Sequence, residues 1–262
     1  MKGKIFILQF SVLSSGSKGN SLYIETKNAC VLIDAGLSKR ELDSRLRIIG
    51  RSPEDLSAVF LTHEHSDHVR GAGQFSRRYG VPLYSTDGTR HAVQDFVGEV
   101  KDWQRIGSNQ RIIVGDMEIE SYPTSHDAAE SIAYVIYYKK LKLGHATDLG
   151  LVTSEVIEKL TGSDVLLVEA NHDEAMLDAG PYPWSVKRRI KSDYGHLSNR
   201  ACAKMLSVLN HSGLQRVGLM HLSETNNHPD IAFLAIQQVL QSHSTEVFLA
   251  RQDRPTKLIA IQ

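Results

Sequence analysis

The sequence has few cysteines and no excess of charge of either sign. Its two cysteines, Cys30 and Cys202, can form neither a disulfide framework nor a cysteine-rich zinc site. So few cysteines in 262 residues fit a reducing compartment, and we expect a cytoplasmic protein. Thirty basic and thirty acidic side chains cancel, which excludes a chain-wide positive field for nucleic acid but leaves room for a local basic patch.

Long hydrophobic runs are also missing, and none approaches the roughly 20 residues that a membrane-spanning helix needs. Lys2 and Lys4 precede an apolar run over residues 5–13, as in a short signal peptide. Gln9 interrupts this run, however, and no small residues typical of a cleavage site follow. We therefore expect a first buried strand here and no contact with a membrane.

The chain also lacks a linker or low-complexity tract, so we predict one domain over residues 1–262. Strands and helices alternate, with several strands followed by helices in each half. This order favours an α/β fold in which two sheets pack face to face with helices outside.

Local signals mark the ends of several elements. Ser38 and Glu41 form a capping-box pattern at the start of a helix that Gly50 ends. Gly115 and Asp116 predict the turn of a hairpin. We expect further helices at 68–79, 154–161, 198–212 and 229–241, and strands within 10–26, 29–36, 56–63, 81–86, 111–124, 131–148, 164–171, 215–223, 246–251 and 257–262.

Histidine, in contrast, is abundant, with twelve residues. The segment LTHEHSDH places His63, His65, Asp67 and His68 in one short loop directly after a predicted buried strand. Such side chains converge when a divalent cation compensates their desolvation and crowding, whereas the alternative is a solvated polar loop. We favour a metal site because the strand anchors the loop.

One loop cannot complete two metal shells, so further ligands are expected where other predicted strands end. His126, Asp148 and His221 occupy such positions. Each alone would be an ordinary capping or surface residue, but together with the first cluster they indicate ligands.

With these residues the sequence resembles the metallo-beta-lactamase superfamily of hydrolases, from the SGSKGNS turn to the strand end at His221. The resemblance implies a four-layer αββα sandwich with two mixed sheets and two divalent metals at one edge. Nitrogen and oxygen ligands suit zinc, manganese or iron. By resemblance, His63, His65 and His126 bind one metal, Asp67, His68 and His221 bind the other, Asp148 bridges them, and Asp34 supports the loop from behind or simply caps its strand.

Two further motifs favour a phosphodiester substrate. GHLSN places His196 just before a helix that begins near Ser198, and it resembles the histidine-plus-hydroxyl motif of transfer-RNA 3′-processing nucleases. Glu169, in VLLVEAN, matches a glutamate that pairs with this histidine and keeps it protonated. Capping for His196 and a buried salt bridge for Glu169 are the structural alternatives. His172 either contacts substrate or starts a helix.

The segment VKRRIK supplies a local basic patch beside this motif, with Arg188 and Arg189 as candidate phosphate contacts or as part of a solvated helix face.

The sequence also resembles the bacterial YycJ/WalJ/VicX group, in the segments SVLSSGSKGNS, LTHEHSDHVRG, EANHD with PYPW, and GHLSN. This resemblance implies a 5′-to-3′ DNA exonuclease that prefers DNA to RNA. In the predicted reaction, a hydroxide bridging the metals attacks phosphorus, Asp67 accepts its proton, and His196 protonates the leaving oxygen. The alternatives are a glyoxalase II-type thioester hydrolase and a non-catalytic metal-binding regulator.

Overall fold

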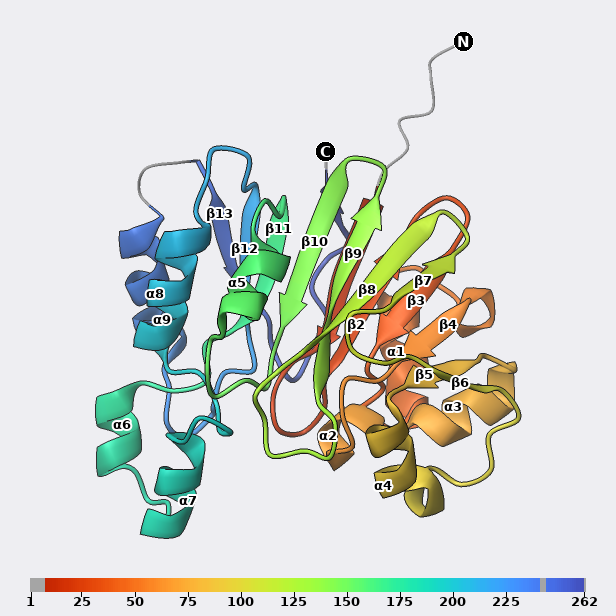
Figure 1. Ribbon diagram of the computed structural model, residues 1–262, viewed down its shortest axis with the longest axis horizontal. Helices are drawn as coiled ribbons and strands as arrows, with labels where there is room; N and C mark the ends of the chain where they lie inside the picture. Colours follow the sequence, from red (N-terminus) through yellow and green to blue (C-terminus); the bar gives the residue numbers. More distant parts are fainter. Residues whose placement is uncertain (1–7, 241–243, 262) are drawn as a thin grey trace.

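The computed structural model describes residues 8–240 and 244–261. They form two seven-stranded sheets, ordered β14-β1-β2-β3-β4-β5-β6 and β13-β12-β11-β10-β9-β8-β7 (Figure 1). Antiparallel pairs give way to parallel pairs within each sheet, so both are mixed as predicted. The first sheet consists of β1 (Leu8–Ser14), β2 (Ser21–Glu25), β3 (Cys30–Ile33), β4 (Ala58–Phe60), β5 (Leu83–Ser85), β6 (Trp103–Arg105) and β14 (Ile259–Ile261). The second consists of β7 (Arg111–Val114), β8 (Met117–Pro123), β9 (Ile132–Tyr138), β10 (Leu141–Ala146), β11 (Val165–Glu169), β12 (Arg216–Met220) and β13 (Glu246–Leu249).

Helices cover the outer faces of both sheets. On the first sheet these are α1 (Lys39–Ile48), α3 (Ala72–Tyr79) and α4 (Asp87–Val97), and on the second α5 (Ser154–Leu160), α8 (Asn199–Leu209) and α9 (Pro229–Val239). Shorter helices are η1 (Pro53–Asp55), α2 (Ser66–Val69), α6 (Glu174–Ala179) and α7 (Trp184–Ile190). None of the helices described is long and apolar enough to cross a membrane.

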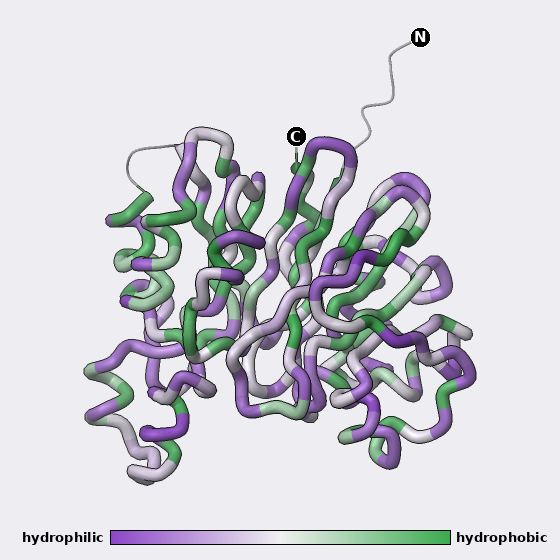
Figure 2. Tube along the Cα trace, in the orientation of Figure 1, coloured by the Kyte–Doolittle hydropathy of each residue, from purple (hydrophilic) through white to green (hydrophobic). Residues whose placement is uncertain are grey.

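Strand periodicity explains the layers. In β9, Ile132, Tyr134 and Ile136 point into the core between the sheets, whereas Ala133 and Val135 pack against the helices of the second sheet. A third cluster lies between the first sheet and its helices. Hydrophobic segments accordingly run through the strands of both sheets (Figure 2). The expected face-to-face packing with helices outside is confirmed.

Several local predictions are confirmed as well. Ser38 caps α1 through a complete capping box with Glu41. The hairpin of β7 and β8 turns at Gly115, whose φ is +61°. The first strand begins at Leu8 within the described residues, while the start of its predicted run lies outside them.

The continuous helix expected over 68–79 is wrong. It is broken into α2 and α3 because the His68 carbonyl accepts from the Ala35 amide and the Gly71 amide donates to the Ala35 carbonyl. A Cβ at Gly71 would lie 2.2 Å from the Leu37 carbonyl oxygen, so only glycine permits this contact. The break turns the metal-binding loop back toward β3. The helix predicted to 212 ends earlier, at Leu209, and α4, α6 and α7 were not predicted.

Candidate metal centre

Three histidines from the two sheets converge at one edge of the sandwich. His63 and His65 lie in the loop after β4, and His126 lies just after β8; their ligand atoms are within 4.8 Å of one another. His65 Nδ1 is 3.0 Å from His63 Nε2 and 3.3 Å from His126 Nε2. His63 and His126 are buried, so their rings are oriented by the core rather than by solvent.

A second group consists of Asp67, His68 and His221, again with ligand atoms within 4.8 Å. Asp67 Oδ2 lies 3.5 Å from His68 Nε2 and 3.6 Å from His221 Nε2. His221 follows β12 in the second sheet, whereas the other two residues lie in α2, after β4 of the first sheet, so this group also joins both sheets.

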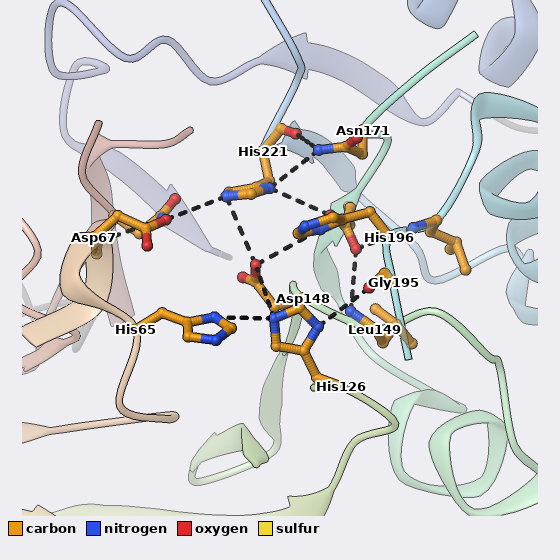
Figure 3. A network of polar contacts seen from close by, with 12 residues as sticks. His65, Asp67, His126, Asp148, Leu149, Asn171, Gly195, His196 and His221 are labelled. Carbon is orange, nitrogen blue, oxygen red and sulfur yellow. Dashed lines mark hydrogen bonds and ion pairs between the residues drawn. The ribbon is translucent and has the colours of Figure 1, made fainter. Parts of the chain in front are cut away.

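Asp148, at the end of β10, lies between the two groups (Figure 3). Its Oδ2 is 3.4 Å from His68 Nε2, and its Oδ1 is 3.6 Å from His221 Nε2 and 3.9 Å from His126 Nε2. Asp148 Oδ2 and His221 Nε2 are buried without a hydrogen-bond partner among the described residues. Buried orphan atoms of this kind, beside imidazole and carboxylate donors, fit divalent cations.

Backbone strain marks the same edge. Asp34, Asp148 and His221 have φ values of +63°, +58° and +54°, in the left-handed region that side chains other than glycine rarely adopt. They follow β3, β10 and β12, each of which pairs in parallel with the next strand along the chain. Strained backbone of this kind is retained where it aims a side chain for function.

Residues that sequence reasoning missed hold the loop in place. Thr62 donates its amide and its hydroxyl to Asp34, and Asp34 in turn lies 2.7 Å from Nδ1 of His68. Asn20 contacts Asp67 Oδ2 at 3.1 Å and His68 Nε2 at 3.0 Å. The place of Asn20 within the SGSKGNS turn is the signal that the sequence offers for this role.

His196 and Glu169 form the predicted pair. Nδ1 of His196 is 2.7 Å from Oε1 of Glu169, and Oε2 of Glu169 accepts from the amides of Leu149 and Leu197. Glu169 is completely buried and also lies 3.3 Å from His221 Nδ1. This carboxylate therefore connects the His196 ring to the ligand cluster.

Charge in the cluster is balanced internally. Burial raises the pKa of Glu169, but the charge and hydrogen bond of His196 outweigh it and lower the pKa to about 2. Burial lowers the pKa of His63 and that of His126, which favours the neutral ring that binds metal. Burial lowers the pKa of His221, yet the neighbouring carboxylates of Asp148, Asp67 and Glu169 raise it to about 10. Without metal, the carboxylates therefore keep protons on part of the histidine cluster.

A cavity of about 310 Å³ opens over the cluster. Of the predicted substrate residues, Arg189 lines this cavity and Arg188 does not. His172 and Ser198 instead line a neighbouring cavity of about 390 Å³, and His196 lines both. The Ser198 hydroxyl caps α8 and donates to Glu174, so part of its role is structural.

Asp127 is a further residue that sequence reasoning missed. Its Oδ1 lies 3.4 Å from His126 Nε2, and its Oδ2 accepts from Arg189 at 2.5 Å. Its position directly after His126 was the only signal. The contact joins α7 to the histidine cluster.

Comparison with known proteins matches residues 30–222 to the beta-lactamase superfamily domain. Exodeoxyribonuclease YycJ of Bacillus anthracis is 37% identical over 238 residues, which cover 89% of this chain and 89% of that protein. Exodeoxyribonuclease WalJ of Streptococcus pneumoniae is 38% identical over 241 residues, with the same coverage of 89% on both sides. The metallo-beta-lactamase fold protein YhfI from Bacillus subtilis superposes with a TM-score of 0.74 at 17% identity, covering 95% of this chain and 99% of YhfI, and confirms the predicted fold.

Proposed function

The chain belongs to the metallo-beta-lactamase superfamily, and from that membership we propose that it is a metal-dependent exonuclease acting on DNA in the 5′-to-3′ direction. The observation that carries this proposal is the contact between His196 and Glu169 beside an intact ligand cluster, in a chain similar to two exodeoxyribonucleases. A thioester hydrolase of the glyoxalase type has no need of this pair, and a non-catalytic regulator has no need of the complete cluster.

We assign two divalent cations, zinc, manganese or iron, to the two groups of ligand atoms. When bound, such cations lower the pKa of a coordinated water and neutralise charge on phosphate oxygens. The residues proposed to hold them are His63, His65 and His126 for one, Asp67, His68 and His221 for the other, and Asp148 between them.

His196 is proposed as the proton donor to the leaving oxygen. Glu169 engages Nδ1, which leaves Nε2 as the ring nitrogen available to a substrate in the cavity. The buried carboxylate fixes the orientation of the ring, and a general acid must be positioned in this way. Asp67 also lines the cavity and is proposed to accept the proton of the attacking water.

Arg189 is proposed to bind a phosphate of the substrate, because this residue lines the cavity and donates from its guanidinium to Asp127. Arg188, on the same helix, is proposed to contact the DNA backbone farther from the scissile bond. His172 and Ser198 are assigned to the side of His196 that faces the second cavity, where the released nucleotide would lie.

The test is a nuclease panel on purified protein loaded with zinc, manganese or iron. End-labelled single- and double-stranded DNA and RNA report the sugar and end preference, and S-lactoylglutathione reports thioester hydrolysis. We expect stepwise release of nucleotides from 5′-phosphorylated DNA and a loss of at least 100-fold in His68→Ala and Asp148→Ala. His91→Ala, an exposed histidine on α4, is the matched control. Full activity in both ligand variants, or thioester cleavage without DNA cleavage, would overturn the proposal.

A further inference from the structure

The segment between β11 and α8 stands apart from the four layers. Helices α6 and α7 project from the body of the molecule (Figure 1). Leu177 is the buried residue of α6, and α7 has none. We call this segment, residues 170–195, the excursion. It begins just after Glu169 and ends just before His196, whose amide donates to the carbonyl of Ile190 in α7 at 2.9 Å. Core packing does not explain the side chains that the excursion carries.

One side of the excursion forms a wall of the metal cavity. Tyr182, Val186 and Ile190 line the cavity together with Asp148 and His196. They bring an aromatic ring and two aliphatic side chains to a cavity whose remaining lining is mostly polar, with imidazoles, carboxylates and hydroxyls. Phosphate alone would not require such a surface, whereas the base or sugar attached to the phosphate would.

The outer side carries an exposed tryptophan. Trp184 begins α7 and keeps 70% of its surface accessible to solvent. Lys187 and Arg188 follow it by three and four positions, so they share its face of the helix. No acidic residue lies in α7. An exposed indole beside cations is the combination by which proteins bind single-stranded nucleic acid without reading its sequence.

The excursion is also stiff. Pro181 and Pro183 flank Tyr182 and fix the backbone φ on both sides. The Lys187 ammonium donates to the Asp178 carbonyl at 2.8 Å, and Lys191 pairs with the Asp178 carboxylate, so α7 is tied to α6. Aromatic rings on a preorganised segment lose little conformational entropy on stacking.

We propose that Tyr182 and Trp184 form a base-stacking site for a single-stranded DNA end whose scissile phosphate lies in the metal cavity. Tyr182 stacks on the base next to that phosphate, and Trp184 stacks on a base farther along the strand. The inference rests on the proposed exonuclease function. Single-stranded DNA is the occupant that fits, because paired bases in a duplex do not expose their faces and a neutral partner would not need the cations of α7.

The test compares oligonucleotides that differ in one base. Single abasic residues are placed at each position near the cleaved end, and KM and kcat are measured for the metal-loaded protein. We expect one abasic position to raise KM for the wild type about 10-fold, within the range for one lost stacking contact. Trp184→Ala should raise KM for the intact strand by a similar factor, and the abasic residue at that position should then raise KM no further. Trp184→Phe should bring KM most of the way back to the wild-type value. Tyr182→Ala should remove the effect of an abasic residue on KM at a position nearer the scissile bond.

Phe96→Ala is the matched control, because Phe96 is 61% exposed on α4, away from the excursion. The two tryptophans of the chain allow an independent measurement. In a Trp103→Phe background, Trp184 fluorescence should be quenched by a phosphorothioate oligonucleotide and much less by its abasic counterpart.

The stacking site would be overturned if the wild type cleaves DNA and the KM of Trp184→Ala still rises when the same position is abasic. Equal quenching by base-containing and abasic strands would overturn it too. Absence of DNA cleavage by the wild type under all metal conditions would instead reject the proposed function itself.

Discussion

Oδ2 of Asp34 lies 2.7 Å from Nδ1 of His68, whereas Nε2 of the same ring faces Asp67 and Asp148. Both side chains are buried. The carboxylate therefore fixes the orientation of the ring and stabilises a proton on the nitrogen that points away from the ligand cluster. Buried carboxylates in this position strengthen metal binding by the ring they hold.

Replacing Asp34 should accordingly weaken metal binding without unfolding the protein. We expect Asp34→Asn to reduce metal affinity by about 10-fold to 100-fold, the usual effect of losing such a partner. Asparagine tolerates the left-handed backbone at this position better than alanine does. Titration calorimetry measures the affinity, and the circular dichroism melting curve checks the fold. Unchanged affinity in a folded variant would contradict the proposed support.

The role of His196 predicts a dependence on the leaving group. A general acid contributes about 10²- to 10⁴-fold when the leaving oxygen needs a proton. His196→Ala should therefore reduce kcat on DNA by such a factor but affect a bis-aryl phosphodiester, whose phenolate leaves unaided, much less. Glu169→Gln should show the same pattern in weaker form. An equal loss on both substrates would assign His196 to binding rather than to proton transfer.

Metal binding should release protons. Burial lowers the pKa of His221, but the neighbouring carboxylates of Asp148, Asp67 and Glu169 raise it to about 10, so the metal-free ring is charged at neutral pH. A charged ring has no lone pair for a cation, and binding must displace its proton. Apparent metal affinity should thus rise as pH rises from about 7 toward 10. Calorimetry in two buffers of different ionisation enthalpy counts the protons, and zero release would contradict the assignment of His221.

Gly195 joins the excursion to His196, the proposed general acid. A Cβ at this position would lie 2.2 Å from the Ile190 carbonyl oxygen and 2.3 Å from that of Arg189. Gly195→Ala should displace His196 and lower kcat at least 10-fold while bound metal stays at the wild-type level. Gly107→Ala is the control, because its nearest new contact is an ordinary 3.5 Å. Metal content by atomic emission and kcat on DNA separate this effect from a general loss of structure.

The basic face of α7 predicts a salt dependence. If Arg188 contacts one phosphate, Arg188→Ala should weaken DNA binding and reduce the slope of log affinity against log salt by about one. Arg47→Ala, on α1 of the opposite sheet, should leave the slope unchanged. Fluorescence anisotropy of labelled DNA at several salt concentrations gives both slopes. Equal slopes in wild type and Arg188→Ala would place Arg188 outside the interface.

Much of this arrangement follows from local sequence. The strand-end positions of Asp148 and His221 predict that these two side chains share one edge, because parallel strands of one sheet end together. That the loop around His63, which follows a strand of the other sheet, meets them there follows from the family resemblance. The pairing of Glu169 with His196 follows from the family resemblance, and the structure brings the two side chains into contact.

Other features depend on contacts distant in sequence and leave no local signal. The break between α2 and α3 depends on a backbone contact with Ala35, and the role of Asn20 depends on contacts between α2 and the turn before β2. Likewise, α7 carries no buried residue, so hydrophobic periodicity could not reveal it. Its composition indicates a basic patch or a solvated helix face, but not the position of the helix.

The left-handed backbone at Asp34, Asp148 and His221 has a consequence for how this chain tolerates mutation. Backbone strain alone would favour glycine at each position by about 1 kcal/mol. At Asp34 the carboxylate also accepts from the amide and hydroxyl of Thr62, so folding itself favours an acceptor there. At Asp148 and His221, selection for the reaction is what retains the side chain, and a lineage that stops using the centre is expected to accept glycine or asparagine at these two positions early. The residues found there in any descendant would therefore record whether the centre is still in use.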